Sequence, residues 1–386
     1  MAENLPKPRR PWRQDDKKGN TAVPGPCNFS EKHKLKMDPT IVGYYSINQD
    51  YKYVGDTSRL KYIRHVPIHE LPLDLNEKSI NAGEFDQNQM FLNFLSFLKE
   101  NKEVLRVVRP QLVKDAPIVC TKTTLTHFFQ SNKLKIAACL ANNVIYLSAA
   151  TESGPISQLN LTNGQNASAW GLKFQQFMQT DEPGGEIDME KLAFGIERFM
   201  CVFQSQLDEH TIIYTGTVDG IRLRGKTPAV DKGDKSSVLE MLNGADLVDL
   251  HITADNKGPN KTNTFRVHKT RKFWSQAYLA GLNNIVIGHR DKFGELLSVE
   301  ETSPTEMQRA ANKTWSPETC LKLCNKNLSG IKKALLEKAA SMSLKHDLEP
   351  GKVPNIQMFF RRQGQNLVQV SYGTEDFPDV HCDHLI

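Results

Sequence analysis

The sequence lacks a long apolar stretch, because nowhere in its 386 residues do 18 apolar residues follow one another. A helix needs about 20 such residues to cross a bilayer, so we expect no membrane span. No apolar segment follows the N-terminus, and secretion is not expected either. The charge excess is also small, at +5 from 49 Lys and Arg against 44 Asp and Glu. This balance permits a nucleic-acid partner without demanding one.

Cysteine is sparse and odd in number, with seven along the chain, which is typical of reduced thiols in the cytosol or nucleus. Cys320 and Cys324 are four residues apart on a predicted helix, and Cys382 and His384 lie near the end. Their spacing matches no common zinc pattern, and buried core cysteines are the simpler interpretation. The sequence also lacks a GxxxxGK phosphate loop and any recognisable Ser/His/Asp arrangement.

The first 38 residues are rich in Pro, Lys and Arg and have little apolar material for a core. We therefore predict a disordered basic tail over residues 1–38. A nuclear-import signal, an arm that contacts phosphates and a simple solvated tail all fit this composition. Residues 39–386 show no repeat and no second composition regime, so we predict a single domain there.

Apolar periodicity in residues 39–386 predicts both strands and helices. The predicted strands span residues 41–46, 117–120, 134–140, 143–149, 211–220, 245–253 and 285–291, with a final hairpin over 355–363 and 366–373. The predicted helices span residues 85–102, 125–130, 189–207 and 317–342, with a further helix beginning near 271. Residues 151–168 and 179–186 are predicted loops, and residues 294–312 a polar linker. The fold class is mixed α/β (α+β), with a two-layer mixed β-sheet core flanked by helices.

Polar residues interrupt two of the predicted central strands. Alternate side chains of a strand share a face, so Thr217 and Asp219 point the same way, as do Asp249 and His251. A metal-dependent nuclease on such strands needs Glu-x-Asp on the first and Glu-x-Lys on the second. Here the first reads Thr-x-Asp and the second Asp-x-His.

The order of the motifs resembles the decapping exoribonuclease (DXO) family. The resemblance rests on residues 43–46 with 53–56, 170–175, 214–219, 248–253, 274–276 and 285–291, and it covers roughly residues 40–375. It implies a nuclease fold that acts on RNA 5′ ends with two divalent cations. Such hard cations need oxygen ligands, and a pair of them clamps the attacking and leaving oxygens.

The resemblance gives several positions a role in metal binding or catalysis, and this chain has a different residue at some of them. Gln175 stands in place of one glutamate, and Thr217 in place of the glutamate of Glu-x-Asp, whose aspartate remains as Asp219. Asp249 stands in place of the glutamate of Glu-x-Lys and is one methylene shorter. His251 replaces the lysine of that motif, and a histidine is largely neutral at pH 7 unless its pKa is shifted.

Two further positions complete the comparison. Lys122 stands in place of an arginine and keeps the charge without the bidentate fork, while Gln276 is retained. Only Asp219 and Asp249 then remain as weak metal ligands, so we expect no catalytic residue, no cofactor and a non-catalytic homologue, a pseudoenzyme. Glu186 and Asp188 spell Glu-x-Asp more faithfully, but we place them in a loop before a helix, where acidic side chains favour the helix N-terminus.

Several basic and polar side chains are expected near the cleft and are candidates for contact with RNA phosphates. They are Lys122, Lys173, Arg271, Lys272, Gln276 and Arg290. For each one alone, a solvated surface position is the alternative interpretation.

The pattern of losses is similar to that of a catalytically degenerate germline member of the family in flies. This resemblance implies a nuclear protein of the piRNA pathway that acts with the chromatin reader Rhino and the linker Deadlock in transposon silencing. It also implies protection of nascent precursor RNA from processing and termination. Two alternatives stay open: a working decapping nuclease that uses Asp219, Asp249 and a further ligand, and a protein-interaction scaffold without RNA affinity.

Overall fold

The computed structural model describes most of the chain after residue 34. The described residues are 35–65, 68–76, 80–81, 87–106, 115–130, 134–151, 161–191, 193–224, 233–254, 269–311, 313–346, 355–363 and 366–370. Residues 35–386 form one compact unit, and only this unit is considered below. The predicted tail lies outside the described residues except at its end. There Met37, which we placed in the tail, is buried and its N–H donates to the Tyr278 hydroxyl at 2.9 Å.

The larger sheet has nine strands in the order β18-β17-β7-β8-β6-β12-β11-β1-β2. In chain order they are β1 (Thr40–Ile47), β2 (Tyr53–Val54), β6 (Ile118–Thr121), β7 (Leu134–Ala141), β8 (Val144–Thr151), β11 (Arg198–Leu207), β12 (His210–Thr217), β17 (Ile356–Gln363) and β18 (Asn366–Val370). β6 runs parallel to β12 and to β8, and the other pairs are antiparallel. The sheet is therefore mixed.

The smaller sheet has seven strands in the order β4-β16-β15-β14-β13-β3-β9. They are β3 (Tyr62–Ile63), β4 (Leu73–Asp74), β9 (Gln179–Thr180), β13 (Gly220–Arg222), β14 (Asp246–Ala254), β15 (Asn284–Arg290) and β16 (Glu295–Thr302). The short strands β5 (Ile80–Asn81) and β10 (Ala193–Phe194) pair with each other. β14 and β15 are parallel, so the chain between them must cross over, and it does so through a helix.

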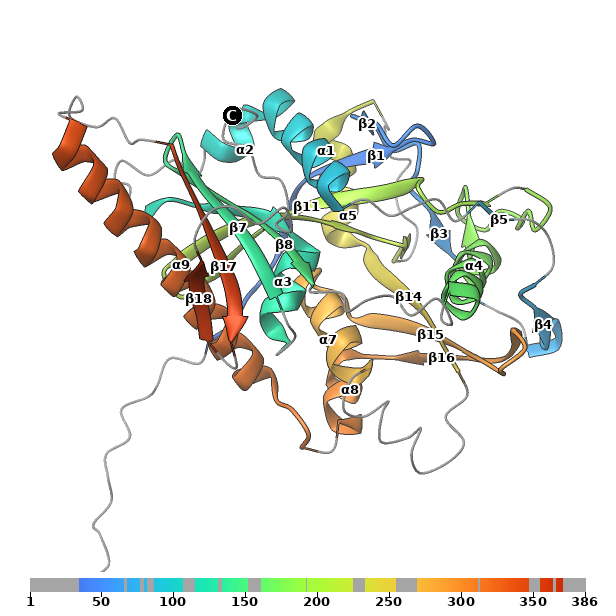
Figure 1. Cartoon of the computed structure of the whole chain (residues 1–386). Helices are drawn as coiled ribbons and strands as arrows, with labels where there is room; N and C mark the ends of the chain where they lie inside the picture. The colour runs from blue at the N-terminus through green and yellow to red at the C-terminus, as the bar shows by residue number, and fades with distance from the viewer. Residues whose placement is uncertain are drawn as a thin grey trace, which may run out of the picture. The chain divides into compact units, whose positions relative to one another are not determined.

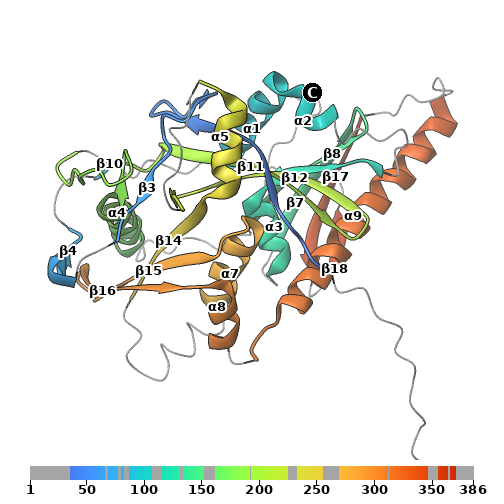
Figure 2. The same ribbon diagram turned by 180° about the vertical axis from the view of Figure 1, so that it is seen from behind.

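Helices flank both sheets (Figures 1 and 2). They are α1 (Gln87–Glu100), α2 (Lys102–Arg106), α3 (Lys122–Phe129), α4 (Leu161–Met178), α5 (Lys235–Gly244), α7 (Thr270–Leu279), α8 (Pro304–Ala310) and α9 (Pro317–His346), with a short 3-10 turn η1 (Ile68–Glu70). Both views show α9 along β17 and β18, and α7 and α8 beside β15 and β16. In the described residues no helix combines the length and apolar character needed to cross a bilayer.

The apolar side chains of the strands separate into three clusters by strand alternation. In β12, Tyr214 faces a cluster that includes α3, α7 and α9, whereas Ile213 faces a cluster built on α1. In β15, Ile287 faces the first of these clusters, and Val286 faces a third cluster built on α4. The predicted mixed α+β fold with two sheets and flanking helices is confirmed.

The helix predicted over residues 189–207 is wrong, because this segment contains β11. Its apolar residues fit a helical stripe, but β11 lies between β12 and β1 and is buried along almost its whole length. A strand buried on both faces carries a nearly continuous apolar run, which periodicity cannot distinguish from a helix.

Two predicted irregular segments also contain regular structure. Residues 294–312, predicted as a polar linker, hold β16 and α8, and residues 161–168, predicted as loop, belong to α4. β16 exposes most of its side chains, so its sequence is polar although its backbone is paired with β15 and β4. The strand predicted over residues 211–220 is divided, because β12 ends at Thr217 and β13 begins at Gly220 in the other sheet. The remaining predicted helices and strands are present, as far as the described residues reach, with small changes of boundary.

The state of the cysteines agrees only in part with the reduced thiols that the composition predicts. Cys120, Cys201, Cys320 and Cys324 are buried free thiols, but Cys139 is disulfide-bonded, which corrects the expectation of reduced thiols throughout. Two residues of the weak zinc candidate, Cys382 and His384, lie outside the described residues.

Candidate functional site

Asp219 lies where the chain leaves one sheet and enters the other. β12 of the nine-stranded sheet ends at Thr217, and Gly220 begins β13 of the seven-stranded sheet by pairing with Val248 of β14. The intervening turn is held by the Val218 N–H, which donates to the Phe199 carbonyl at 3.1 Å. The retained aspartate of the motif therefore sits at the junction of the two sheets.

Both carboxylate oxygens of Asp219 accept hydrogen bonds from this chain. The side-chain amide of Gln175, on α4, donates to Oδ1 at 3.1 Å, and the Leu250 N–H, on β14, donates to Oδ2 at 2.8 Å. The Gln179 amide also donates to the Asp219 carbonyl at 2.6 Å. Gln175 thus satisfies one carboxylate oxygen of Asp219, and the backbone of β14 satisfies the other.

The surroundings of Asp219 disfavour its charged form. Burial has the largest effect, the charge of Asp249 adds to it, and together they raise the pKa of Asp219 to about 6. The hydrogen bond from the Leu250 N–H and the positive charges of His251 and Lys122 oppose this rise. Asp219 is therefore the acid of the pair that more readily takes up a proton.

Asp249, on β14, is 5% exposed and remains anionic. Burial alone would raise its pKa, but the Lys122 ammonium and then His251 outweigh that effect and lower the pKa to about 2. Its Oδ2 lies 3.5 Å from His251 Nε2, an ion-pair distance whose geometry does not make a hydrogen bond. The two side chains lie on one face of β14, as strand alternation predicts.

The His251 ring is fixed by an aromatic contact. It stacks on Phe273 of α7 with ring centroids 3.9 Å apart and planes 6° from parallel. This contact holds the imidazole beside Asp249, where the resemblance places a lysine ammonium. The position now carries a flat ring packed against a helix.

Lys122 brings a positive charge to the two carboxylates from the first turn of α3. It is buried, and its ammonium donates to the Thr217 carbonyl at 2.9 Å. Its aliphatic stem lies against β12 at Gly216, where an added Cβ would come within 2.8 Å of Lys122 carbons. The glycine therefore allows the lysine to reach the junction of the sheets.

These residues do not fit a pair of divalent cations. Among the described residues, no group of three or more His, Cys, Asp or Glu side chains could hold a metal ion. The Asp219 oxygens already accept N–H groups, and Asp249 is balanced by Lys122 and His251. Gln276 of α7 contributes a buried Oε1 without a hydrogen-bond partner. The two carboxylates are thus engaged by N–H groups and by the Lys122 ammonium, which leaves them poorly suited to bind two divalent ions.

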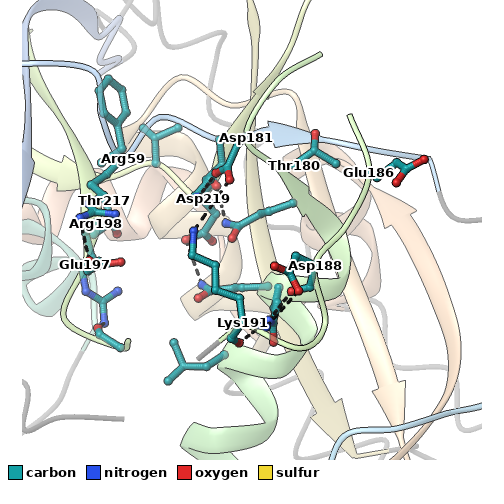
Figure 3. Close-up of a pocket in the computed structure, with 18 residues that line it drawn as sticks. Arg59, Thr180, Asp181, Glu186, Asp188, Lys191, Glu197, Arg198, Thr217 and Asp219 are labelled. Atoms are coloured by element: carbon teal, nitrogen blue, oxygen red, sulfur yellow. Dashed lines mark hydrogen bonds and ion pairs between the residues drawn. The ribbon is translucent and has the colours of Figure 1, made fainter. Parts of the chain in front are cut away.

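A pocket of about 160 Å³ opens beside Asp219 (Figure 3). Thr217 and Asp219 both line it, although Asp219 lies in the turn after β12 and not in the strand where alternation placed it. Glu186 and Asp188 also line it, but they come from a loop rather than from a strand, and no helix follows them. Asp188 Oδ1 accepts from the N–H groups of Glu190 and Lys191, which is the bonding of a turn.

The pocket also contains charged residues that sequence reasoning missed. Arg59 pairs with Glu197 at 2.7 Å, and Lys61 pairs with Asp181. Figure 3 shows Arg59, Glu197 and Arg198 on one side of Asp219, with Glu186 and Asp188 on the other. Residues 59 and 61 both precede the short β3 and carry no motif. The pairing of β3 with β13 and β9 brings them to the pocket, and the sequence holds no local signal of that pairing.

The predicted RNA contacts divide into buried and accessible side chains. Lys173 was predicted to contact RNA phosphates, but it is buried. Its ammonium donates to Gln176 Oε1 at 3.1 Å and to the Met189 carbonyl at 2.8 Å. The guanidinium of Arg271 has a buried Nε without a hydrogen-bond partner. Lys272 is exposed, and the Arg290 guanidinium lies 4.1 Å from the Trp170 ring centroid.

Comparison with known proteins gives the family. The family model of the RAI1-like PD-(D/E)XK nuclease matches residues 37–369. The chain belongs to this family. It is 27% identical to the decapping and exoribonuclease protein Rai1 of Drosophila melanogaster over 317 residues, which cover 77% of this chain and 80% of that protein. It is 23% identical to the human decapping and exoribonuclease protein, with 84% and 82% covered.

Solved structures of RAI1-like proteins share this fold. Rai1 of Candida albicans in complex with pU5 and Mn²⁺ superimposes with a TM-score of 0.62 at 14% identity, covering 89% of this chain and 91% of that one. Rai1 of S. pombe in complex with 3′-FADP gives a TM-score of 0.59 at 18% identity, with 89% and 97% covered. The resemblance of the motifs to the decapping family is confirmed at the level of family and fold.

Proposed function

We propose that this RAI1-like protein binds RNA 5′ ends and does not hydrolyse them. The observation that carries the proposal is the contact between Gln175 and Asp219. An amide hydrogen occupies the carboxylate oxygen on which a family member would bind a cation, and the amide itself brings no negative charge. Because hydrolysis depends on the whole unit of ligands, the loss of one member removes most of the rate.

The charges around Asp249 support the same conclusion. Two acids, Asp219 and Asp249, face the cation of Lys122 and the imidazole of His251. Lys122 offsets one of the two acidic charges without a metal, so at most one negative charge is left to offset two divalent ions. A groove of this kind can hold the polar end of an RNA chain while lacking the clamp that cleaves phosphodiesters.

RNA binding is supported by the relatives and by the pocket. The Drosophila and human relatives named above are decapping and exoribonuclease proteins, and one solved relative is in complex with pU5. In this chain, the cations Arg59, Lys61 and Arg198 line the pocket beside Asp219, where Arg59 pairs with Glu197 and Lys61 with Asp181. The phosphates of an RNA end would replace these carboxylates as partners of the two cations.

The proposal extends to a cellular role. The substitutions at positions 175, 217, 249 and 251 resemble those of the fly germline protein Cutoff. On this basis the chain acts in the nucleus of germline cells, with Rhino and Deadlock, at chromatin that produces piRNA precursors. A 5′ end held without hydrolysis would be shielded from decapping and exonucleases, which would suppress termination and sustain transposon silencing during oogenesis.

A protection assay tests the biochemical part. RNA with a 5′-triphosphate is incubated with the protein and then challenged with an active family member such as Drosophila Rai1. We expect slower loss of the 5′ end, and protection should decline as salt rises because phosphate contacts are salt-dependent. Equal loss with and without the protein would favour the scaffold alternative.

Co-elution tests the partner assignment separately. The purified chain is mixed with recombinant Deadlock and Rhino and passed over a sizing column. A shared peak is expected. Separate peaks for the chain and for Deadlock would contradict the assignment to this complex without touching the RNA claim.

A further inference from the structure

Arg362 is a buried arginine near the end of β17. The inward positions of this strand alternate, and Ile356, Met358 and Phe360 belong to the apolar cluster that includes α3, α7 and α9. Arg362 takes the next inward position and is only 7% exposed. A guanidinium stays charged in proteins, so a permanent positive charge lies where the strand otherwise buries apolar side chains.

The Arg362 guanidinium has a hydrogen-bond partner on one edge only. Nη1 donates to the Gln130 carbonyl at the C-terminal end of α3, where the last carbonyls of a helix lack partners within it. Nε and Nη2 are buried and make no hydrogen bond, and Arg362 is the only described arginine with two such nitrogens. Their N–H groups share one edge, the fork that binds two oxygens of a carboxylate or a phosphate.

The positive charge of Arg362 is not balanced by a carboxylate. Burial lowers the pKa of the guanidinium, and the opposing charge effect comes from the Cys324 thiol. Capping of α3 is the simpler interpretation of Arg362, because the partial negative charge of a helix C-terminus offsets part of a cation. Capping uses one nitrogen, however, and leaves the fork and most of the charge without a partner.

His127 has unsatisfied nitrogens next to the same helix end. Its carbonyl accepts the Gln130 N–H, so it lies one turn before the residue that Arg362 caps. Both ring nitrogens are buried and make no hydrogen bond. Burial, and then the charges of Lys272 and Arg362, lower the pKa of His127 to about 4. The ring is therefore neutral at pH 7, and one of its nitrogens carries an N–H that can donate to a further oxygen.

Helix α7 adds two cations beside α3. α3 packs against α7 and α9, and α9 packs against β17. The Phe129 and Trp274 rings stack between α3 and α7 with centroids 5.7 Å apart. At the start of α7, Arg271 has a buried Nε without a hydrogen-bond partner, whereas Lys272 is exposed. The basic group thus extends from the buried fork of Arg362 to the surface at Lys272.

We infer that Arg362 and His127 form a binding site for a terminal phosphate group, with Arg271 and Lys272 at its border. The fork of Arg362 binds two phosphate oxygens, and a ring N–H of His127 donates to a third. The ligand class is inorganic phosphate or the phosphate monoester of a small molecule. The inference goes beyond the proposed function, because this site is built on α3, α7 and β17 and contains neither Asp219 nor Asp249.

The charge and the burial of the group favour a terminal phosphate over other oxygen ligands. A water molecule could accept the N–H groups but would leave the positive charge of Arg362 without a counter-ion. A carboxylate would fill the fork but has no third oxygen for His127. A phosphodiester within a nucleic-acid strand carries substituents on two of its oxygens, and the free nitrogens of Arg362 are buried, so the strand could not reach them.

Thermal unfolding in the presence of inorganic phosphate tests the site. With sodium chloride holding the ionic strength constant, phosphate should raise the unfolding midpoint of the wild-type chain, because a ligand of the folded state stabilises it. Acetate should raise it less. Arg362→Lys keeps the charge but loses the fork, so it should need about tenfold more phosphate for the same rise. Arg309→Lys, at an exposed position of α8, is the matched control and should respond as wild type does.

A measurement on the wild-type chain keeps the test independent of any variant. The ring resonances of the histidines are followed by NMR across pH, with and without phosphate. An anion beside the imidazole favours its charged form, so the pKa of His127 should rise from about 4 towards the ordinary histidine value of about 6.5. The exposed His69 is the internal control and should titrate alike in both solutions.

Three results would overturn the inference. They are an unchanged His127 titration in phosphate, an equal response of Arg362→Lys and wild type, and an equal effect of acetate. The 5′-triphosphate RNA of the protection assay should leave the His127 resonances unshifted, and a shift like that caused by phosphate would assign these residues to the RNA surface instead. Failure of RNA protection would contradict the proposed function without touching the phosphate site.

Discussion

The Gln175 side-chain amide donates a 3.1 Å hydrogen bond to Oδ1 of Asp219, and this contact joins α4 to the junction of the two sheets. A carboxylate at position 175 could not make it without a proton or a cation between the two groups. The substitution therefore does more than remove a ligand. It gives the remaining aspartate a neutral partner and lets the buried junction fold without metal.

The Gln175→Glu variant tests this relationship. Two carboxylates about 3 Å apart cannot both ionise at low cost, so the variant should be less stable than wild type at pH 8 by about 1–3 kcal/mol. The loss should shrink at pH 5, where the pair can share a proton. Urea unfolding at both pH values measures it, with Gln363→Glu at an exposed position as control.

The same variant should not regain nuclease activity. Lys122, Thr217, Asp249 and His251 still occupy the other positions at which this chain departs from the motifs that it resembles. Wild-type stability of Gln175→Glu at pH 8 without added metal would contradict the role given to the amide.

The raised pKa of Asp219 predicts how stability depends on pH. Its pKa is about 6 in the folded protein, against about 3.9 in an unfolded chain. The unfolded state therefore releases the proton first, and stability from this group is present below pH ~4 and lost as pH rises to ~6. The two pKa values differ by roughly two units, so the loss is at most about 3 kcal/mol.

The Asp219→Asn variant isolates that effect. Its side chain does not titrate, so the stability difference between wild type and variant should shift in favour of the variant as pH rises from about 4 to about 7. Urea unfolding across this range measures the shift, with Asp50→Asn as an exposed control. The stability that Asp249 contributes depends on pH in the opposite direction. Its pKa is lowered in the folded protein, so this stability is lost only as pH falls from ~4 towards ~2. A difference that stays constant with pH would contradict the assignment of the raised pKa to Asp219.

Replacing Lys122 should lower the free energy of unfolding, because the buried carboxylates would lose their positively charged partner. Lys122→Met keeps the stem that packs against Gly216 but leaves Asp249 buried without its main cation. Breaking a buried pair in this way costs about 3–5 kcal/mol, and the free energy of unfolding should fall by that order. Lys322→Met, at an exposed position of α9, is the control. An equal effect of the two substitutions would show that Lys122 does not support the carboxylates.

Much of the fold could be predicted from the sequence where an element has one buried face or where a turn marks its end. α1 follows its apolar stripe. β7 and β8 are buried on both faces, but the turn through Asn142 and Asn143, whose φ values are positive, separates two short apolar runs. β11 could not be predicted, because a strand buried on both faces loses the alternation that identifies it. β16 failed for the opposite reason, since its exposed side chains hide a paired backbone.

The candidate site could also be predicted only in part. Motif order brought Gln175, Thr217 and Asp219 together, and alternation placed Asp249 beside His251. No local pattern could show that Lys173 would turn inward to a loop carbonyl. Nor could it show that Arg59 would line the pocket, because that depends on the meeting of the two sheets in space.

Cleavage of RNA tests the central claim most directly. The purified protein is incubated with 5′-triphosphate RNA and Mg²⁺ or Mn²⁺, alongside Drosophila Rai1 as a positive control and the Asp219→Ala variant of this chain. The account predicts RNA that stays intact with this protein while it is processed by the control. Metal-dependent processing by the wild-type chain that disappears in Asp219→Ala would contradict it.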